Sequence, residues 1–448
     1  FGSSPIPRST PPFFTAAPLP ACLPAPEEAV AMATMKKVVI IGGGPSAKHC
    51  AENLVGAKNL QVTIVSANKF VEWPLAMPAC LVNPELHDKA ISPNFDTYKV
   101  KGVEYKFGPA TSVDVSAQTV TYCADGKDEA VPYDALIVAT GFGMSLVYPE
   151  LGTSLADRKA QVLKVDAAIK AGSNVVVCGG GPVGLELAGS IRVQYPDKKV
   201  VLVSRSKILA GNPEKTQNTV MGVLKSMNID LATGDISGAP EDFSLEAGSL
   251  TVGNEKVSYD VFLPMYSRGP NTAFLKSCPE LLDAKGAIKV NESLQSTGRG
   301  QIFAVGVGDN KVSFIGFAKL ADQWKDVTNN VKAYLEGKEL KKHKEGMPGM
   351  THPPVVLVGN IMNGKGAWAG IDCSVLPGPL KCCCCCGMGG FPFCPPPCCW
   401  PCVHPCCVGY CGGKPEGAGP AACLGPLAFK TAGFHFKGIG EAPKQQTM

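Results

Sequence analysis

Two stretches of the chain repeat one order of apolar strand, glycine turn and helix. The first, KKVVIIGGGPSAKHCAENL, begins at Lys36 and is followed by a second apolar run, LQVTIVSANKF. The same order returns in SNVVVCGGGPVGLELAGSI, and KKVVLVSRSKIL comes after it. Short apolar runs bounded by glycine are typical of buried parallel strands, and the intervening segments suit helices. Each stretch therefore predicts a right-handed strand-helix-strand unit, and the chain contains two of them.

The first glycine turn has the spacing of a dinucleotide-binding fingerprint. Gly42 permits a tight turn, Gly44 lets a pyrophosphate approach the backbone, and Ala47 keeps the helix close to its strand. The helix N-terminus then faces the phosphates. The turn predicts that a nucleotide is held by Gly42, Gly44, Pro45, Ser46 and Ala47.

The second glycine turn repeats this spacing. A single copy of such a turn is weak evidence, because it serves equally well as a packing device. Two copies, each between a predicted strand and a predicted helix, favour nucleotide binding. The candidate residues of the second site are Gly179, Gly181, Pro182, Val183, Gly184 and Glu186.

The ends of the two second strands lack the acidic residue that normally accepts hydrogen bonds from the adenosine ribose. The first strand ends at Ser66, so a hydroxyl or a neighbouring backbone group has to make the ribose contact. The second strand ends in Ser204-Arg205-Ser206-Lys207. Arg205 and Lys207 are suited to pair with a 2′-phosphate, which favours NADPH over NADH. The alternative is that both are solvated surface cations.

Three further segments resemble elements of flavoprotein reductases with two dinucleotide domains, the pyridine nucleotide-disulfide oxidoreductase superfamily. YDALIVATG looks like the end of the FAD domain's first part, YDVFLPMYSRGPNTAFL like the return strand, and QIFAVGVGDN like the last flavin motif. The resemblance implies FAD in the first fold and NADPH or NADH as hydride donor in the second. It assigns FAD contacts to Thr140, Gly141, Gly308 and Asp309, although an extra Gly-Val pair interrupts the last motif.

The segment KFVEWPLAMPACLVNP resembles the apoptosis-inducing-factor-like branch that includes the ferroptosis-suppressor flavoprotein. VVLVGNIMNGKGAWAGIDCSVLPGPLK and FKTAGFHFKGIGEAP look like the short C-terminal segment of that branch. The resemblance implies an NAD(P)H oxidoreductase that passes hydride from nicotinamide to flavin and electrons to a small-molecule acceptor of the quinone type. It also implies action at a membrane surface.

Length and composition suit this organisation. The 448 residues are 45% hydrophobic and 18% charged, and the net charge of +4 is too small to indicate nucleic acid as a partner. We expect an α/β protein with two Rossmann-like domains, the second inserted in the first. The predicted parts are a disordered leader or targeting remnant (1–34), the FAD-binding domain's first part (35–150), an NAD(P)-binding domain (151–280), the FAD-binding domain's return segment (281–340) and a C-terminal extension (341–448).

Cys80 offers a competing chemistry. A closely spaced redox pair of cysteines is missing from the first predicted helix, but a single thiolate at Cys80 would make the protein a flavin-dependent thiol or peroxide reductase. That role requires a lowered thiol pKa, and the alternative is a small buried apolar residue. A third hypothesis is a flavoprotein that acts as a binding or assembly component.

The cysteine- and proline-rich segment 382–411 has three interpretations. It suits S-acylation and thus peripheral membrane contact, it holds a partial zinc ligand set, or it is an insertion without defined chemistry. We assign no metal to the catalytic site. Since no apolar run reaches the ~18 residues that a spanning helix needs, we expect a cytoplasmic or organellar protein that does not cross the membrane.

Overall fold

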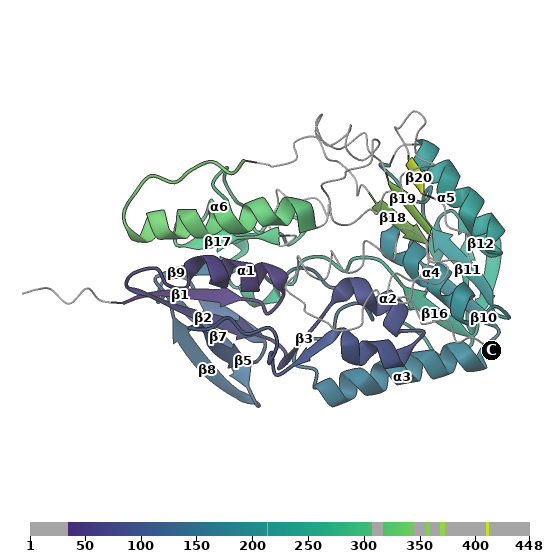
Figure 1. Cartoon of the computed structure of the whole chain (residues 1–448), viewed down its shortest axis with the longest axis horizontal. Helices are drawn as coiled ribbons and strands as arrows, with labels where there is room; N and C mark the ends of the chain where they lie inside the picture. Colours follow the sequence, from purple (N-terminus) through teal and green to yellow (C-terminus); the bar gives the residue numbers. More distant parts are fainter. Residues whose placement is uncertain are drawn as a thin grey trace, which may run out of the picture. The chain divides into compact units, whose positions relative to one another are not determined.

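The computed structural model describes residues 35–212, 214–306 and 317–344, and three short strands at 355–358, 368–371 and 409–411. Contacts divide the chain into residues 1–34 and 35–448, and every described element belongs to the second unit (Figure 1). The predicted leader, the Gly308–Asp309 motif and nearly all of segment 382–411 lie outside the described residues.

The first sheet joins strands from both ends of the described chain. Its order is β17-β9-β1-β2-β5, and all of its neighbours pair in parallel. The middle strands are buried along nearly their whole length, which explains their unbroken apolar sequences. The strands are β1 (Lys36–Ile41), β2 (Leu60–Ser66), β5 (Glu104–Phe107), β9 (Ala135–Val138) and β17 (Ile302–Ala304).

The second sheet repeats the arrangement of the first. Its order is β12-β11-β10-β16, again with parallel neighbours. In both sheets the strand before the glycine turn pairs on one side with the next strand of its own unit and on the other with a strand from far along the chain. The order of strands therefore reverses beside each turn, where open parallel sheets bind ligands. The strands are β10 (Asn174–Cys178), β11 (Lys199–Ser204), β12 (Ile229–Thr233) and β16 (Val261–Pro264).

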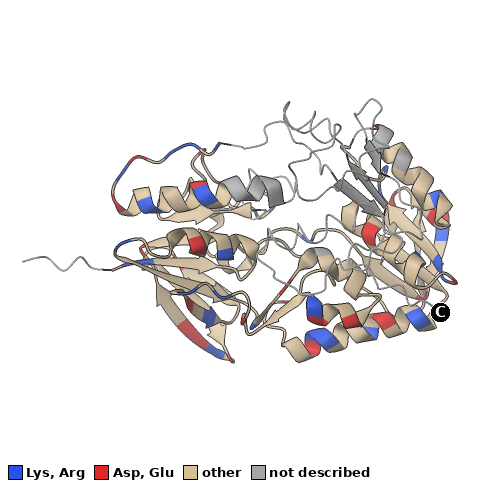
Figure 2. Ribbon diagram, viewed as in Figure 1, with Lys and Arg blue, Asp and Glu red and all other residues tan. Residues whose placement is uncertain are grey.

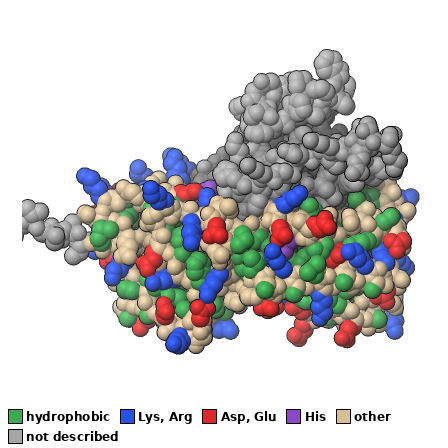
Figure 3. All heavy atoms as spheres, turned by 60° about the horizontal axis from the view of Figure 1, so that its bottom comes forward, with side chains coloured by type: hydrophobic (Ala, Val, Ile, Leu, Met, Phe, Trp, Pro, Cys, Tyr) green, Lys and Arg blue, Asp and Glu red, His purple; other side chains and the backbone are tan. Residues whose placement is uncertain are grey.

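Helices cover the two sheets. Helix α1 (Pro45–Leu54) and helix α6 (Phe317–Leu335) pack against each other over the first sheet. Over the second sheet lie α3 (Leu155–Ala171), α4 (Pro182–Gln194) and α5 (Glu214–Ser226). Lysines, arginines and carboxylates alternate along α3, and charges of both signs intermix on the face drawn in Figure 3 (Figures 2 and 3).

Antiparallel strands, which the sequence did not reveal, cover the opposite faces. Val113 and Val120 pack beneath the first sheet, and Leu250 and Val252 pack beneath the second. One three-stranded sheet is β6 (Ala110–Asp114), β7 (Thr119–Ala124) and β8 (Lys127–Pro132), and the other is β13 (Ile236–Ser237), β14 (Gly248–Val252) and β15 (Glu255–Tyr259). A third joins β18 (Val355–Val358), β19 (Trp368–Ile371) and β20 (Gly409–Cys411).

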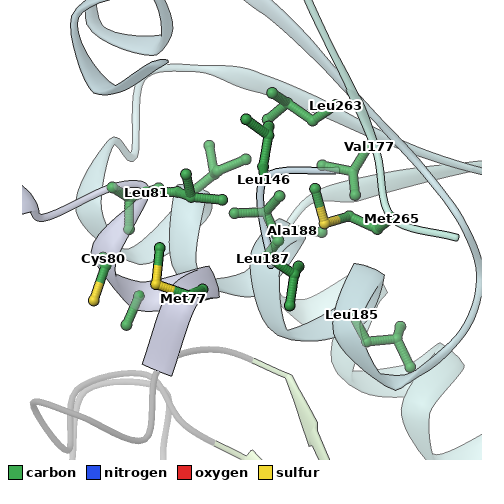
Figure 4. Packing of buried hydrophobic residues seen from close by; sticks show 14 of the residues in the cluster. Met77, Cys80, Leu81, Leu146, Val177, Leu185, Leu187, Ala188, Leu263 and Met265 are labelled. Atoms are coloured by element: carbon green, nitrogen blue, oxygen red, sulfur yellow. The ribbon is translucent and has the colours of Figure 1, made fainter. Parts of the chain in front are cut away.

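Residues 70–98, here called the connecting segment, lie between β2 and β5. The segment holds β3 (Phe70–Glu72) paired with β4 (Ile91–Pro93), the short helix α2 (Met77–Cys80) and two 3₁₀ turns, Pro74–Ala76 and Pro84–Lys89. Met77 and Leu81 pack with Leu187 and Ala188 of α4 (Figure 4). The connecting segment thus joins the core of the second sheet.

The α/β fold with two parallel Rossmann-type sheets confirms the predicted fold class. The chain returns to the first sheet earlier than residue 281, because Phe274, Leu275 and Cys278 already pack in that sheet's core. Among the described residues, no helix is both long and apolar enough to cross a membrane.

Candidate functional site: two nucleotide cradles

Each glycine turn lies against the backbone of the neighbouring parallel strand. Gly42 has φ +127° and Gly179 has φ +141°, a region that L side chains rarely adopt. A Cβ at Gly42 would overlap the carbonyl of Ala139, directly after β9, and a Cβ at Gly179 would overlap that of Met265, directly after β16. Both positions require glycine because of backbone conformation and of space.

The middle glycines, which sequence reasoning did not single out, are constrained by a serine below them. A Cβ at Gly43 would overlap Ser66 Oγ, and one at Gly180 would lie 2.5 Å from Ser204 Oγ. Both serines are buried and end the second strand of their unit. The signal was present in the sequence as an identical Gly-Gly-Gly triplet followed by a strand that ends in serine.

The third glycine of each triplet faces open space. A Cβ at Gly44 or Gly181 would meet nothing within 4 Å. Helices α1 and α4 begin at the following prolines, and their first intrahelical bonds run from Lys48 N to Gly44 O and from Leu185 N to Gly181 O. The amides before those residues point out of the helix end and are suited to bind an anion. Both turns therefore fit a pyrophosphate.

The last fingerprint position sets how closely each helix packs on its strand. Ala47, on the buried face of α1, is fully buried, so the first unit accommodates a methyl group at this position. A Cβ at Gly184 would overlap the carbonyl of Gly179, so the second unit does not. Gly184 thus has a packing role, as the fingerprint predicts for this position.

The second cradle opens into a cavity of about 670 Å³. Six of the predicted nucleotide residues line it: Gly179, Gly181, Pro182, Val183, Arg205 and Lys207. The structure does not place the other two, Gly184 and Glu186, in its lining. Met265, Tyr266 and Ile236 line it as well, and they were not predicted.

The cavity is electrostatically suited to an anion. Arg205 and Lys207 are exposed at its wall, and neither has an ion-pair partner in the described part of the chain. None of the described lining residues is Asp or Glu. A phosphate would therefore meet two cations and no competing carboxylate.

The predicted flavin residues Thr140 and Gly141 lie in a loop that pairs with the Arg-Gly-Pro-Asn turn after β16. Asn271 holds this loop with two hydrogen bonds. Its backbone N–H donates to Gly141 O (3.0 Å), and its side-chain amide donates to Thr140 O (3.1 Å). Thr140 Oγ1 is buried without a hydrogen-bond partner among the described residues. An orphaned hydroxyl beside the first cradle fits a bound cofactor that supplies the missing partner.

Ser66 lies where the sequence placed it, but its hydroxyl is engaged. Ser66 Oγ donates to Asn68 O at 3.0 Å, beneath the first glycine turn. Its proton is therefore unavailable to a ribose in this arrangement. Asn68, which sequence reasoning missed, accepts from Gly152 N–H (2.7 Å) and donates to Glu150 O (3.1 Å).

Glu186 of α4 has a perturbed carboxyl group. Burial raises its pKa to about 8, and no described residue forms a hydrogen bond or ion pair with the carboxyl. Burial therefore favours the protonated form of the carboxyl in the absence of a ligand.

Cys80 does not meet the requirement for a redox thiol. Its side chain is fully buried, and burial, with a further contribution from Glu72, raises the pKa of the thiol. An activated cysteine needs the opposite shift. The geometry supports a small buried apolar residue.

Two nucleotide cradles in one chain, at the switch points of two parallel sheets, define a protein that brings two dinucleotides together. Residues 36–313, well over half of the chain, match the model of the pyridine nucleotide-disulphide oxidoreductase family. The chain belongs to that family. It is an oxidoreductase, its cofactors are FAD and NADH or NADPH, and the predicted superfamily is confirmed.

Individual relatives agree with this assignment. The chain is 28% identical over 331 residues to oxidoreductase ptaL of Pestalotiopsis fici, covering 70% of this chain and 88% of the relative. It is 25% identical over 335 residues to ferroptosis suppressor protein 1 of Xenopus tropicalis, covering 70% and 85%, which confirms the predicted branch. The sulfide:quinone oxidoreductase of Aquifex aeolicus shares the fold, with a TM-score of 0.58, 18% identity, and 77% and 85% of the two chains covered.

We expect Gly180→Ala to weaken nucleotide binding in the second cradle while leaving FAD bound. The new methyl group would displace Ser204 and the turn that rests on it. The dissociation constant for NADPH, from fluorescence titration, should rise at least ~10-fold, as for a lost charge-assisted contact.

Gly222→Ala is the matched control, because a Cβ there meets nothing within 4 Å and the residue lies in α5. It should leave binding unchanged. A Gly180→Ala protein that binds NADPH normally would contradict the close contact with Ser204.

We expect the stability of the nucleotide-free protein to fall as pH rises from about 4.5 to about 8, in part through Glu186. Burial raises its pKa to about 8 in the folded state, so the unfolded chain ionises first and is favoured over that interval. The melting temperature of Glu186→Gln relative to the unmodified protein should therefore increase from pH 5 to pH 8.5. Glu255→Gln, at an exposed position on β15, should show no such trend.

Proposed function

We propose that this enzyme takes hydride from NADPH onto FAD and delivers the electrons to an acceptor of the quinone type. The observation that carries the proposal is the second cradle's cavity, with two uncompensated cations and no acidic residue in its described lining. When bound, the flavin supplies the redox chemistry, and the chain supplies position and electrostatics.

The preference for NADPH follows from charge. An acidic residue after the second strand would accept hydrogen bonds from the ribose hydroxyls of NADH and would repel a 2′-phosphate. Here Ser204 ends β11, and Arg205 and Lys207 come after it. Both cations lie in the lining of the same cavity as the pyrophosphate turn, so a single dinucleotide can reach the turn and the two cations.

The chain divides the binding task between its two halves. We assign the flavin contacts to Gly42, Gly44, Pro45, Ser46, Thr140 and Gly141, with Gly308 and Asp309 from outside the described residues. Ala47 and Ser66, both buried, support the turn by packing. We assign the nicotinamide nucleotide contacts to Gly179, Gly181, Pro182, Val183, Arg205 and Lys207, with Gly184 supporting the turn by its packing against Gly179. Glu186 receives no contact in this assignment.

The quinone acceptor rests on the resemblance to the ferroptosis-suppressor branch and on the state of Cys80. With that thiol buried and its pKa raised, electrons have no cysteine relay at this position and pass from the flavin directly to a small acceptor. Attachment at a membrane surface is part of the same proposal. It rests on the cysteines of segment 382–411, which suit S-acylation.

We expect the double variant Arg205→Gln/Lys207→Gln to lose its preference for NADPH. Two charge-assisted bonds to the 2′-phosphate would be removed, so kcat/KM for NADPH should fall about 10- to 100-fold while that for NADH changes little. Steady-state kinetics with both cofactors measures the ratio. Lys256→Gln, at an exposed site on β15, is the control. An equal loss with both cofactors would refute 2′-phosphate recognition.

We expect quinones to reoxidise the reduced enzyme and Cys80→Ser to leave this turnover unchanged. The measurement is anaerobic reduction of the FAD-loaded protein by NADPH, followed by mixing with a panel of short-chain quinones, a disulfide and hydrogen peroxide. Loss of turnover in Cys80→Ser would favour the thiol or peroxide reductase instead. Bound FAD that neither nicotinamide cofactor reduces would favour the binding or assembly role.

A further inference from the structure

The connecting segment touches both nucleotide units. At one end, Phe95 lies so close to the first glycine turn that a Cβ at Gly43 would stand 2.9 Å from its ring. At the other end, Met77 and Leu81 pack on α4, the helix that begins at the second turn (Figure 4). The hydroxyl oxygen of Tyr195, whose proton has Asp166 as its closer acceptor, also lies 3.2 Å from Val82 O.

A cluster of three ionisable side chains is buried where this segment meets α3. Glu72 accepts from Arg158 Nε, at 3.0 and 3.1 Å to its two oxygens, and contacts His87 Nε2 at 2.6 Å. The three side chains are only 1 to 3% exposed. The cluster thereby joins β3, the turn Pro84–Lys89 and α3.

Arg158 extends the cluster to the loop that leaves the first cradle. Its remaining nitrogens donate to Leu146 O and to Gln161 Oε1, both at 2.6 Å. Leu146 has φ +63°, a strained conformation for leucine. This strained turn lies between Thr140–Gly141 and α3, so Arg158 fixes the path of the chain from the first cradle to the second unit.

The directional hydrogen bonds to Glu72 explain why this buried position holds charged side chains instead of apolar ones. Burial opposes ionisation of Glu72, but hydrogen bonds from His87 and Arg158 outweigh it and hold its pKa below the ordinary value. An apolar cluster of the same volume would pack as well, because desolvation offsets most of the attraction in a buried ion pair. It would not fix the angle between the joined elements.

We propose that Glu72, Arg158 and His87 form a positioning site that holds the connecting segment in register between the two cradles and thereby sets the rate of hydride transfer from nicotinamide to flavin. Hydride transfer requires near-contact geometry, and a displacement of about 1 Å lowers such rates by on the order of 100-fold. Binding of each cofactor depends on its own glycine turn and is far less sensitive to register. The inference rests on the proposed hydride transfer from NADPH.

The test is stopped-flow reduction of the FAD-loaded protein by NADPH without oxygen. Glu72→Gln leaves Arg158 buried without its anion, and we expect the limiting rate of flavin reduction to fall at least ~10-fold, with the NADPH dissociation constant within about twofold of the unmodified protein. Lys159→Ala is the matched control. Lys159, next to Arg158, forms an ion pair (2.6 Å) with Asp88, next to His87, and this pair also joins α3 to the turn Pro84–Lys89. Because the pair is exposed, its loss should not change the rate.

A normal limiting rate in folded, FAD-loaded Glu72→Gln would overturn the proposal. So would weaker NADPH binding with an unchanged limiting rate, since that result describes a binding role. If Glu72→Gln fails to fold, Glu72→Met/Arg158→Met replaces the ion pair with apolar side chains of similar length. A folded double variant with a slowed rate supports positioning, and one with a normal rate overturns it. Failure of the unmodified protein to be reduced by NADPH would reject the proposed function itself.

Discussion

The close approach of each glycine turn to the carbonyl after the neighbouring strand is the contact on which the rest of the molecule depends. It places the mouth of each cradle at the point where the strand order reverses, between β1 and β9 and between β10 and β16. Any side chain at Gly42 or Gly179 would separate the turn from that strand. The helix end would then move away from the site where a pyrophosphate binds, because α1 and α4 begin only three residues later.

Both cradles share this contact, so the difference between their proposed cofactors must lie outside it. Both turns rest on a serine, and both helices begin with proline, so the phosphate-binding parts are equivalent. The two units diverge immediately after that serine. Beyond Ser66 the chain enters the connecting segment, whereas beyond Ser204 it presents Arg205 and Lys207 to the cavity. In the proposed assignment, selectivity therefore lies in a few residues outside the shared turn.

The sequence predicted those helices and strands that are specified by patterns of neighbouring residues. The glycine spacing and the apolar runs were sufficient for β1, α1, β2 and for β10, α4, β11, since the residues that define each of these units are contiguous in the chain. The antiparallel strands beneath the sheets and the cluster around Glu72 were not predictable. Glu72 and Arg158 are 86 positions apart, and no spacing rule indicates that a glutamate and an arginine at that separation share a buried site. The orphaned hydroxyl of Thr140 likewise depends on tertiary packing.

The cluster around Glu72 also bears on the competing chemistry at Cys80. A thiolate would need a nearby cation that is free to stabilise it. Arg158 is a nearby cation, and its charge lowers the pKa of the thiol, but burial and the charge of Glu72 act in the opposite direction and prevail. The two terminal nitrogens of Arg158 donate hydrogen bonds to Gln161 Oε1 and Leu146 O, and its Nε donates to Glu72. In this arrangement Arg158 is committed to the ion pair that joins the connecting segment to α3, and its charge does not suffice to activate Cys80.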